Sequence, residues 1–379
     1  MAEPVTVYNL IEDDGQEALK AEIEKAYADA GTVSARKRAA AEIEATGESD
    51  GGGLEVDEPV DLTPPKDLIG IEPSVFRQIE AALNSGKRHI MFYGPPGTGK
   101  TTIARWLAGV LNGRNRTLIT GSADWSSQEI IGGYQPLGTG SIKFFPGVLL
   151  RNFDRPLIID ELNRCDIDKV IGPLFTVLSG QATTLPYRLV ADDPASEQFT
   201  ILPNYKAEPA DYEYSPTPHW RLIATINSID KASLYQMSYA LSRRFGWIFV
   251  DAPKDTVGFI TSYLESFMGR ELVQRAEKPP LAQIWDAIND VRMIGPAPII
   301  DALKALEHLA PGSDLMAQPE GDLRVAYLDV FDLFMLPLLD GILRHEAEQI
   351  AAKIVSALGL ESEAQEVLAL KRRILSIAV

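Results

Sequence analysis

Residues 88–101 read RHIMFYGPPGTGKT, and the rest of the chain is organised around this stretch. An apolar run over 90–93 leads into a loop with the pattern G-x-x-x-x-G-K-[ST], and a helical stretch over 102–111 follows. A strand, a glycine-rich loop and a helix in this order are typical of a loop that binds the phosphates of a nucleotide. The stretch therefore predicts a nucleoside triphosphate site at the end of a buried strand.

The residue types in the loop follow from this chemistry. Backbone N–H groups must face phosphate oxygens, and side chains in place of the glycines would block that approach. The helix N-terminus adds partial positive charge, the lysine reaches the β- and γ-phosphates, and the following threonine ligates Mg²⁺. The predicted nucleotide-binding residues are Gly94, Pro95, Pro96, Gly97, Thr98, Gly99, Lys100, Thr101 and Thr102, with Ile69 and Gly70 from the segment before the first helix.

A second motif ends another apolar run. Residues 156–160 read PLIID, Glu161 follows, and Asp160 lies 60 residues after Lys100. Asp160 is predicted to hold Mg²⁺ together with Thr101, and Glu161 to polarise the attacking water. A buried strand with acids at its exposed end is the plain alternative, but its spacing from the phosphate loop favours the catalytic interpretation.

Strand-like and helix-like patterns alternate through the middle of the chain, which indicates a parallel α/β sheet. The expected strands are 90–93, 116–120, 156–160, 221–226 and 247–250, and the expected helices are 73–85, 102–111 and 170–179. Residues 124–147 and 181–219 are predicted to be insertions. Beyond 253 only helical spacing occurs, at 255–268, 281–294, 298–309, 323–345, 347–358 and 362–377.

The first 60 residues differ from the rest in charge. They hold 5 Lys/Arg and 15 Asp/Glu in a chain whose net charge is −17. Helices are expected at 17–30 and 35–45, and a flexible linker at 46–59. The predicted domains are therefore 1–60, a nucleotide-binding domain at 61–252 and a helical domain at 253–379.

Composition argues against several function classes. The charge is not that of a free-standing DNA-binding protein, and no apolar run approaches the roughly 20 residues of a membrane span. The N-terminus lacks the pattern of a signal peptide. A single cysteine excludes an intramolecular disulfide, and four scattered histidines disfavour a zinc site. These features lead us to expect a cytoplasmic protein.

Three segments carry a specific family resemblance. LIIDELNRCDIDKVIGPLF, RLIATINSIDKAS and YALSRRF resemble the AAA+ ATPases of the MoxR and McrB (dynein-related) group, over roughly residues 66–379. The resemblance implies a P-loop NTPase AAA+ core with a parallel five-stranded sheet, followed by an α-helical lid. It implies that Asn227 positions the attacking water, that Arg243 or Arg244 is an arginine finger, and that 124–147 contains an inserted β-hairpin.

The resemblance also implies an activity and partners. Such proteins hydrolyse ATP or GTP with Mg²⁺ in a ring, typically a hexamer. MoxR members use ATP and remodel proteins, with a von Willebrand-type partner; McrB members are associated with GTP and a McrC-like nuclease. We expect ATP in preference to GTP and partner remodelling. The McrB-like motor is the alternative, because ATINSID is closest to that branch. A nucleotide-gated scaffold with little turnover is the alternative from another class.

The chain departs from the family pattern in two places. Where MoxR proteins carry a lid arginine, this chain reads Gly-Pro-Ala-Pro-Ile over 295–299, and Arg292 or Arg324 are open substitutes. Residues 1–60 are also too short and acidic for the DNA-reading domain of some McrB proteins. Phe144 and Phe145 could line a pore or form the core of the inserted hairpin. The aromatics of 181–219 are expected to be loop packing.

Overall fold

The computed structural model describes residues 62–65, 68–113, 115–138, 140–227, 243–272, 278–361 and 364–379. The helices expected at 17–30 and 35–45 and the linker at 46–59 lie outside these residues, as do residues 228–242. The described residues all belong to one compact unit, Gly51–Val379. The domain boundaries expected from the sequence remain a prediction.

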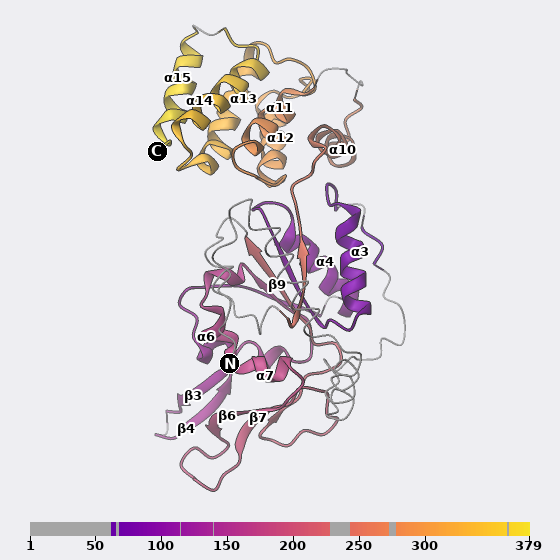
Figure 1. Ribbon diagram of the computed structural model, residues 1–379, viewed down its shortest axis with the longest axis vertical. Helices are drawn as coiled ribbons and strands as arrows, with labels where there is room; N and C mark the ends of the chain where they lie inside the picture. Colours follow the sequence, from indigo (N-terminus) through magenta and orange to yellow (C-terminus); the bar gives the residue numbers. More distant parts are fainter. Residues whose placement is uncertain are drawn as a thin grey trace, which may run out of the picture. The chain divides into compact units, whose positions relative to one another are not determined.

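A parallel five-stranded sheet lies at the centre of the nucleotide-binding region (Figure 1). Its strand order is β10-β1-β9-β5-β2, and each neighbouring pair is parallel. All five strands expected from the sequence are present, within a few residues of the predicted limits. Their bounds are β1 His89–Gly94, β2 Thr117–Thr120, β5 Leu157–Asp160, β9 Leu222–Asn227 and β10 Phe245–Phe249.

Helices cover both faces of this sheet, so its strands read as continuous apolar runs. Side chains alternate between faces along each strand. Ile90 and Phe92 of β1 pack with the helices α3 (Pro73–Asn84) and α4 (Lys100–Asn112). Met91 belongs to the cluster on the opposite face. Strand β1, which leads into the phosphate loop, is therefore buried on both faces of the sheet.

The prediction of one continuous helix over 170–179 is wrong. The chain forms α6 (Ile167–Ile171), a 3₁₀ turn η4 (Gly172–Leu174) and α7 (Phe175–Leu178). Pro173 lacks the backbone N–H that a continuous helix needs, which accounts for the interruption. Asp166 starts α6 by accepting a hydrogen bond from the Lys169 N–H at 3.2 Å.

Both predicted insertions carry strands of their own. Residues 124–147 contain the short helix α5 (Ser127–Ile130) and an antiparallel hairpin, β3 (Gly132–Pro136) and β4 (Ile142–Pro146). Residues 181–219 contain a three-stranded sheet, β6 (Thr183–Arg188), β7 (Gln198–Ile201) and β8 (Glu213–Tyr214). Phe144 is 4% exposed and stacks on Phe199 at 4.5 Å between ring centroids, so it belongs to the core that joins the insertions. Phe145 is exposed.

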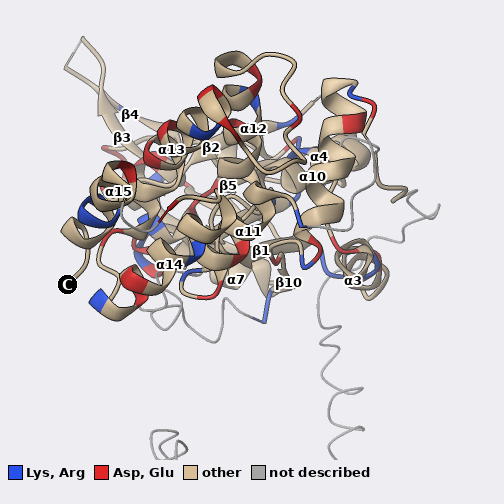
Figure 2. Ribbon diagram, turned by 90° about the horizontal axis from the view of Figure 1, so that it is seen from above, with Lys and Arg blue, Asp and Glu red and all other residues tan. Residues whose placement is uncertain are grey.

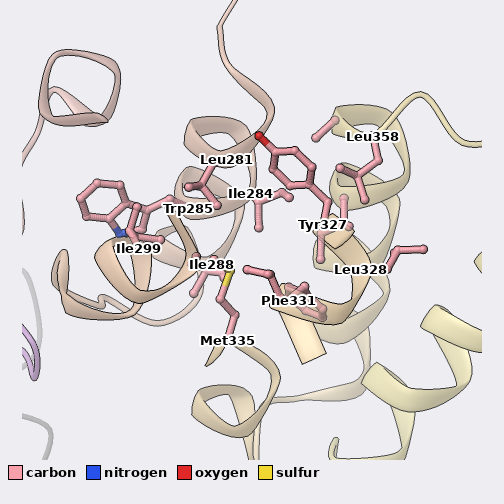
Figure 3. Close-up of a cluster of buried hydrophobic side chains, with 14 of the residues drawn as sticks. Leu281, Ile284, Trp285, Ile288, Ile299, Tyr327, Leu328, Phe331, Met335 and Leu358 are labelled. Atoms are coloured by element: carbon pink, nitrogen blue, oxygen red, sulfur yellow. The ribbon is translucent and has the colours of Figure 1, made fainter. Parts of the chain in front are cut away.

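A second core holds the helical region together. It contains α10 (Thr256–Met268), α11 (Pro280–Asn289), α12 (Ala297–Leu309), α13 (Gly321–Phe334), α14 (Arg344–Ala357) and α15 (Gln365–Ser376). Trp285 and Tyr327 are fully buried near its centre (Figure 3). Acidic and basic residues are interspersed over the outer surfaces of these helices (Figure 2). Among the described residues, none of the helices combines the length and hydropathy needed to cross a membrane.

The helix expected at 323–345 is also interrupted. Helix α13 ends at Phe334 and a 3₁₀ turn, η5 (Leu336–Leu339), follows before α14 begins at Arg344. Pro337 lies in that turn. In a continuous helix it would remove one backbone hydrogen bond, because proline has no N–H. The apolar periodicity continues through the break because both helices pack on the same core.

Candidate active site

The phosphate loop joins β1 to α4 in a conformation that its glycines make possible. Gly94, Gly97 and Gly99 have φ values of 151°, 74° and 84°. A Cβ at Gly94 would lie 2.1 Å from the Val250 carbonyl oxygen, so strand β10 also requires glycine there. The loop is therefore fixed by backbone geometry and by close packing against the sheet.

Lys100 is 5% exposed, and its ammonium group lies across the loop. Its Nζ donates to the carbonyl oxygens of Gly94 at 3.0 Å and Pro95 at 2.5 Å. Burial lowers the pKa of Lys100 to about 8, against the opposing attraction of Asp160 and Glu161. A bound phosphate would supply the negative charge that this desolvated cation lacks.

Asp160 and Thr101 come together as a metal site requires. The Thr101 hydroxyl donates to Asp160 Oδ1 at 2.6 Å, and Thr225 of β9 donates to the same oxygen at 2.6 Å. Mg²⁺ prefers hard oxygen ligands and keeps several waters, so a carboxylate beside a hydroxyl fits that ion. Sequence reasoning missed Thr225, although an internal threonine in the apolar run of β9 was a signal.

Glu161 occupies an unusual backbone conformation directly after β5. Its φ and ψ are 53° and 48°, and within the described residues no other non-glycine residue has positive φ. Such conformations cost of order 1–3 kcal/mol and persist where surrounding contacts hold them. The Glu161 N–H donates to Thr225 Oγ1 at 2.9 Å, and Gly121 leaves room for the Glu161 carbonyl.

The two carboxylate oxygens of Glu161 have different partners. Asn227 Nδ2 donates to Oε1 at 3.1 Å, and Arg164 Nε forms an ion pair with Oε2. The structure thus brings together Asp160, Glu161 and Asn227, and their catalytic roles remain predictions. The contact of Arg164 with Glu161 is new; the sequence showed Arg164 only as part of the DELNR segment.

A cavity of about 600 Å³ extends from the phosphate loop to the helical region. Asp160, Glu161 and Asn227 line one end, and Ile69, Ile71 and residues of α10 and α12 line the other. Gly70 lies beside this end, where a Cβ would approach Phe259 to 2.4 Å. On α10 three rings stack in sequence: Phe259 on Tyr263 at 6.4 Å and Tyr263 on Phe267 at 5.2 Å between centroids. The further lining includes Pro96, Gly97, Thr98, Gly99, Lys100, Thr101, Thr102, Ile300 and Lys304.

The lid contacts the phosphate loop directly through its backbone. The Gly295 N–H donates to the Pro96 carbonyl at 2.9 Å, and the Ala297 N–H donates to the Gly97 carbonyl at 3.2 Å. A Cβ at Gly295 would lie 2.2 Å from the Gly97 carbonyl carbon. The Gly-Pro-Ala-Pro segment thus packs directly against the phosphate loop. Gly295 allows this close contact because it has no Cβ.

Arg292 and Arg324, the open substitutes for a lid arginine, make contacts elsewhere. Arg292 Nη1 donates to the Leu338 carbonyl at 2.7 Å, and Arg324 Nε donates to the Pro319 carbonyl at 3.3 Å. Lys304 of α12, which sequence reasoning did not single out, lines the nucleotide cavity instead. Its position two turns into α12 was visible only once the helix was placed.

Arg243 and Arg244 precede β10, at the opposite end of the sheet from the phosphate loop. Arg244 donates through Nε and Nη2 to Ser179 Oγ at 3.0 and 2.5 Å. The Arg243 carbonyl accepts a hydrogen bond from Lys87 Nζ at 2.9 Å. The fold therefore does not bring these arginines to the nucleotide cavity of their own chain.

The sheet order, the phosphate loop and the Asp160–Glu161 pair define a P-loop nucleoside triphosphatase of the AAA+ class. Residues 89–245 match the AAA domain (dynein-related subfamily), the group that the sequence segments resemble. The chain is 29% identical over 217 residues to the type IV methyl-directed restriction enzyme EcoKMcrB subunit of Escherichia coli strain K12. The match spans 54% of this chain and 42% of that protein.

Solved structures show a more distant likeness. The Thermotoga maritima RuvB Holliday junction branch migration motor is 18% identical, with a TM-score of 0.43. The alignment covers 79% of this chain and 87% of that one.

Proposed function

We propose that this chain is a Mg²⁺-dependent ATPase that works in a homo-oligomeric ring, a hexamer, and uses the nucleotide cycle to remodel a partner protein in the cytoplasm. The observation that carries the proposal is the continuous contact from Thr101 through Asp160 and Thr225 to Glu161 and Asn227. The groups that we propose bind the metal and activate water are connected in this one network.

Each residue of this network has a role that its contacts support. Bound Mg²⁺ would neutralise charge on the β- and γ-phosphates. Thr101 and Asp160 hold it, and Lys100 leaves the loop carbonyls to contact phosphate oxygens. Glu161, oriented by Asn227, accepts a hydrogen bond from the attacking water and polarises it. Arg164 must release Oε2 of Glu161 for that oxygen to reach water.

The far end of the cavity supports ATP as the nucleotide. Ile69, Ile71 and the stacked rings of α10 offer an apolar slot to a purine. The carboxylates that line the cavity, Asp160 and Glu161, are engaged at the phosphate end, whereas guanine needs an acceptor for its N1–H and amino group. Competition between ATP and GTP for a labelled analogue tests this preference, and tighter GTP binding would reverse it.

The position of Arg243 and Arg244 supports a shared site. They lie away from their own cavity, as an arginine finger for a neighbouring subunit must. An arginine supplied in trans is worth roughly 10³–10⁵ in rate in phosphoryl transfer.

A McrB-like motor is the second candidate, favoured by the restriction-enzyme relative. The chain spans about two fifths of that relative's length, so its partner and substrate do not transfer directly. Purified von Willebrand-type and McrC-like proteins encoded beside the gene would separate the candidates. Stimulation of ATP turnover by the first supports remodelling, and stimulation by the second supports the nuclease motor.

The activity is tested with Glu161→Gln, which keeps the size of the side chain and removes its charge. Nucleotide binding should remain while hydrolysis falls to background. The matched control is Glu265→Gln on the exposed surface of α10. Turnover in Glu161→Gln equal to that of the control would remove Glu161 from the mechanism. A wild-type chain that binds nucleotide without turnover would favour the scaffold alternative.

A further inference from the structure

An arginine stands just before every strand of the parallel sheet. Arg244 precedes β10, Arg88 precedes β1 and Arg221 precedes β9. Arg155 and Arg116 stand before β5 and β2. Because the strands are parallel, all five arginines lie at one edge, opposite the phosphate loop. A chain of net charge −17 therefore concentrates positive charge at this edge.

Arg88 and Arg221 are neighbours in the middle of this row. Ile90 pairs with Ile223, and extending that register by two residues places Arg88 beside Arg221. Burial, and to a smaller extent the charge of Arg88, lower the pKa of Arg221 to about 10. Burial also lowers the pKa of Arg88. The two guanidinium groups are thus desolvated side by side.

Neither arginine of this pair contacts a carboxylate in the described part of the chain. Arg88 Nη2 reaches only the Thr217 carbonyl at 3.4 Å. Arg221 Nη1 donates to the carbonyls of Pro218 and Trp220 at 2.6 and 2.8 Å. Arg155 differs, because it forms an ion pair with Asp154. Among the described residues, the middle of the row therefore lacks the negative charge that arginines removed from water normally pair with.

Several polar atoms around the pair are buried without a hydrogen-bond partner. They are Arg88 Nε, Arg221 Nε, Trp220 Nε1 and Thr217 Oγ1. Buried donors of this kind are rare and costly, most of all when they are charged. Three N–H donors and one hydroxyl at this end of β1 and β9 thus lack partners, and an oxyanion is a group that accepts several hydrogen bonds.

The adjacent histidine adds no further positive charge to the pair. His89 is buried, and its Nδ1 accepts the Leu222 N–H at 3.0 Å. Burial and the two arginines lower the pKa of His89, so it remains neutral at pH 7. Arg88 and Arg221 are partly buried: their Nε atoms are enclosed, whereas other parts of both side chains remain exposed to solvent and to an anion.

We propose that Arg88 and Arg221 form an oxyanion-binding site, for a carboxylate or a phosphate group, at the sheet edge opposite the nucleotide cavity. The site adjoins the segment of Arg243, because Lys87, next to Arg88, is hydrogen-bonded to the Arg243 carbonyl. Its occupant therefore neutralises charge beside the arginines proposed to act on a neighbouring subunit. The site itself is independent of the proposed function.

The test uses the full chain with Lys100→Ala, which weakens phosphate binding at the loop. Inorganic phosphate is titrated by calorimetry, and the melting temperature is followed in parallel. Saturable binding is expected, and adding Arg88→Met and Arg221→Met should weaken it by roughly tenfold or more, since charged hydrogen bonds are lost. The matched control is Arg116→Met in the same row, which should leave binding unchanged.

A parallel titration with acetate identifies the source of the anion. Saturation by both probes points to a carboxylate-compatible site, and saturation by phosphate alone points to a phosphate group; both support the site.

Phosphate binding that is equal in the arginine variant and in the control would overturn the proposed site, as would a non-saturating response. Without phosphate the single variant Arg88→Met should melt no lower than Arg116→Met, because it relieves repulsion. A much lower melting temperature would also overturn the proposal, since the pair would then be stable without an anion.

Discussion

The Thr225 hydroxyl connects the two acidic residues of the site: it donates to Asp160 Oδ1 at 2.6 Å and accepts the Glu161 N–H at 2.9 Å. One buried side chain on β9 thereby orients the carboxylate predicted to hold the metal. It also holds the strained backbone of the predicted base. The geometry of both acids depends on a residue that itself touches neither nucleotide phosphate nor water in the proposed mechanism.

Replacing Thr225 should therefore damage catalysis more than binding. Thr225→Val keeps the shape and leaves the Glu161 N–H without its acceptor. It also removes the donor to Asp160 Oδ1, so two hydrogen bonds are lost, and we expect ATP turnover to fall by roughly tenfold or more, with little change in nucleotide affinity. Steady-state kinetics and calorimetry measure both. Thr225→Ser should restore most of the rate; if it does not, Thr225 contributes packing rather than orientation.

Nucleotide binding should depend on Lys100. Lys100→Ala removes the desolvated cation that faces the phosphates, so most affinity for ATP with Mg²⁺ should be lost. Lys143→Ala, on the exposed hairpin strand β4, is the matched control. Calorimetric affinities that are the same for both variants would mean that the phosphates bind elsewhere.

The contact between lid and loop predicts a specific effect of one methyl group. In Gly295→Ala the Cβ would lie 2.2 Å from the Gly97 carbonyl carbon, so the lid must shift away. We expect weaker nucleotide binding with the helical core intact. Gly138→Ala, where nothing lies within 4 Å, should change neither. Normal affinity in Gly295→Ala would show that the lid contact is irrelevant to binding.

Cys165 gives a chemical test of the core beneath the site. It is 7% exposed, its Sγ lies 3.1 Å from the Leu162 carbonyl, and burial raises its pKa to about 11. The thiolate is the reactive form, so alkylation at pH 8 should be far slower in the native chain than in urea. Because the unfolded thiol ionises first, the stability that Cys165 contributes should fall as pH rises from 9 to 11. Rapid native labelling would contradict the packing described for η3 (Leu162–Arg164) and α6.

Mixing two inactive variants tests the shared site. Glu161→Gln retains its arginines, and the double variant Arg243→Ala/Arg244→Ala retains Glu161. Each should be nearly inactive alone, and exchange of subunits should restore part of the turnover at interfaces that combine both intact halves. Full activity of the arginine variant, independent of concentration, would instead place catalysis within one subunit.

The sheet and its phosphate loop could be predicted because the local signals agree. Apolar runs, glycines and the acid at the end of β5 each require the same arrangement, so five strands were placed correctly. The helices at 170–179 and 323–345 were predicted as continuous because apolar periodicity persists across Pro173 and Pro337. In each case the segments before and after the proline pack on the same core, so the apolar periodicity is the same as in one continuous helix.

Residues whose roles depend on tertiary contacts were harder to find. Thr225 looks like an ordinary strand residue until β9 is placed beside β5. The ion pair of Arg164 with Glu161 could not be predicted, because it depends on the positive φ of Glu161. Lys304 lies 204 positions from Lys100 in the sequence, yet both line one cavity. Helical and strand periodicity relates only residues that are close in the sequence, so it cannot indicate such a shared cavity.

The hydrogen bonds of Gly295 and Ala297 use the carbonyl side of the phosphate loop and leave its N–H side for an anion. Both sides belong to the same rigid peptide planes: the carbonyl of Pro96 and the N–H of Gly97 cannot rotate separately. A phosphate that turns the Gly97 N–H toward itself must therefore also turn the oxygen that holds Gly295. A rotation of this peptide plane would therefore alter the hydrogen bond to Gly295 and the phosphate contact together.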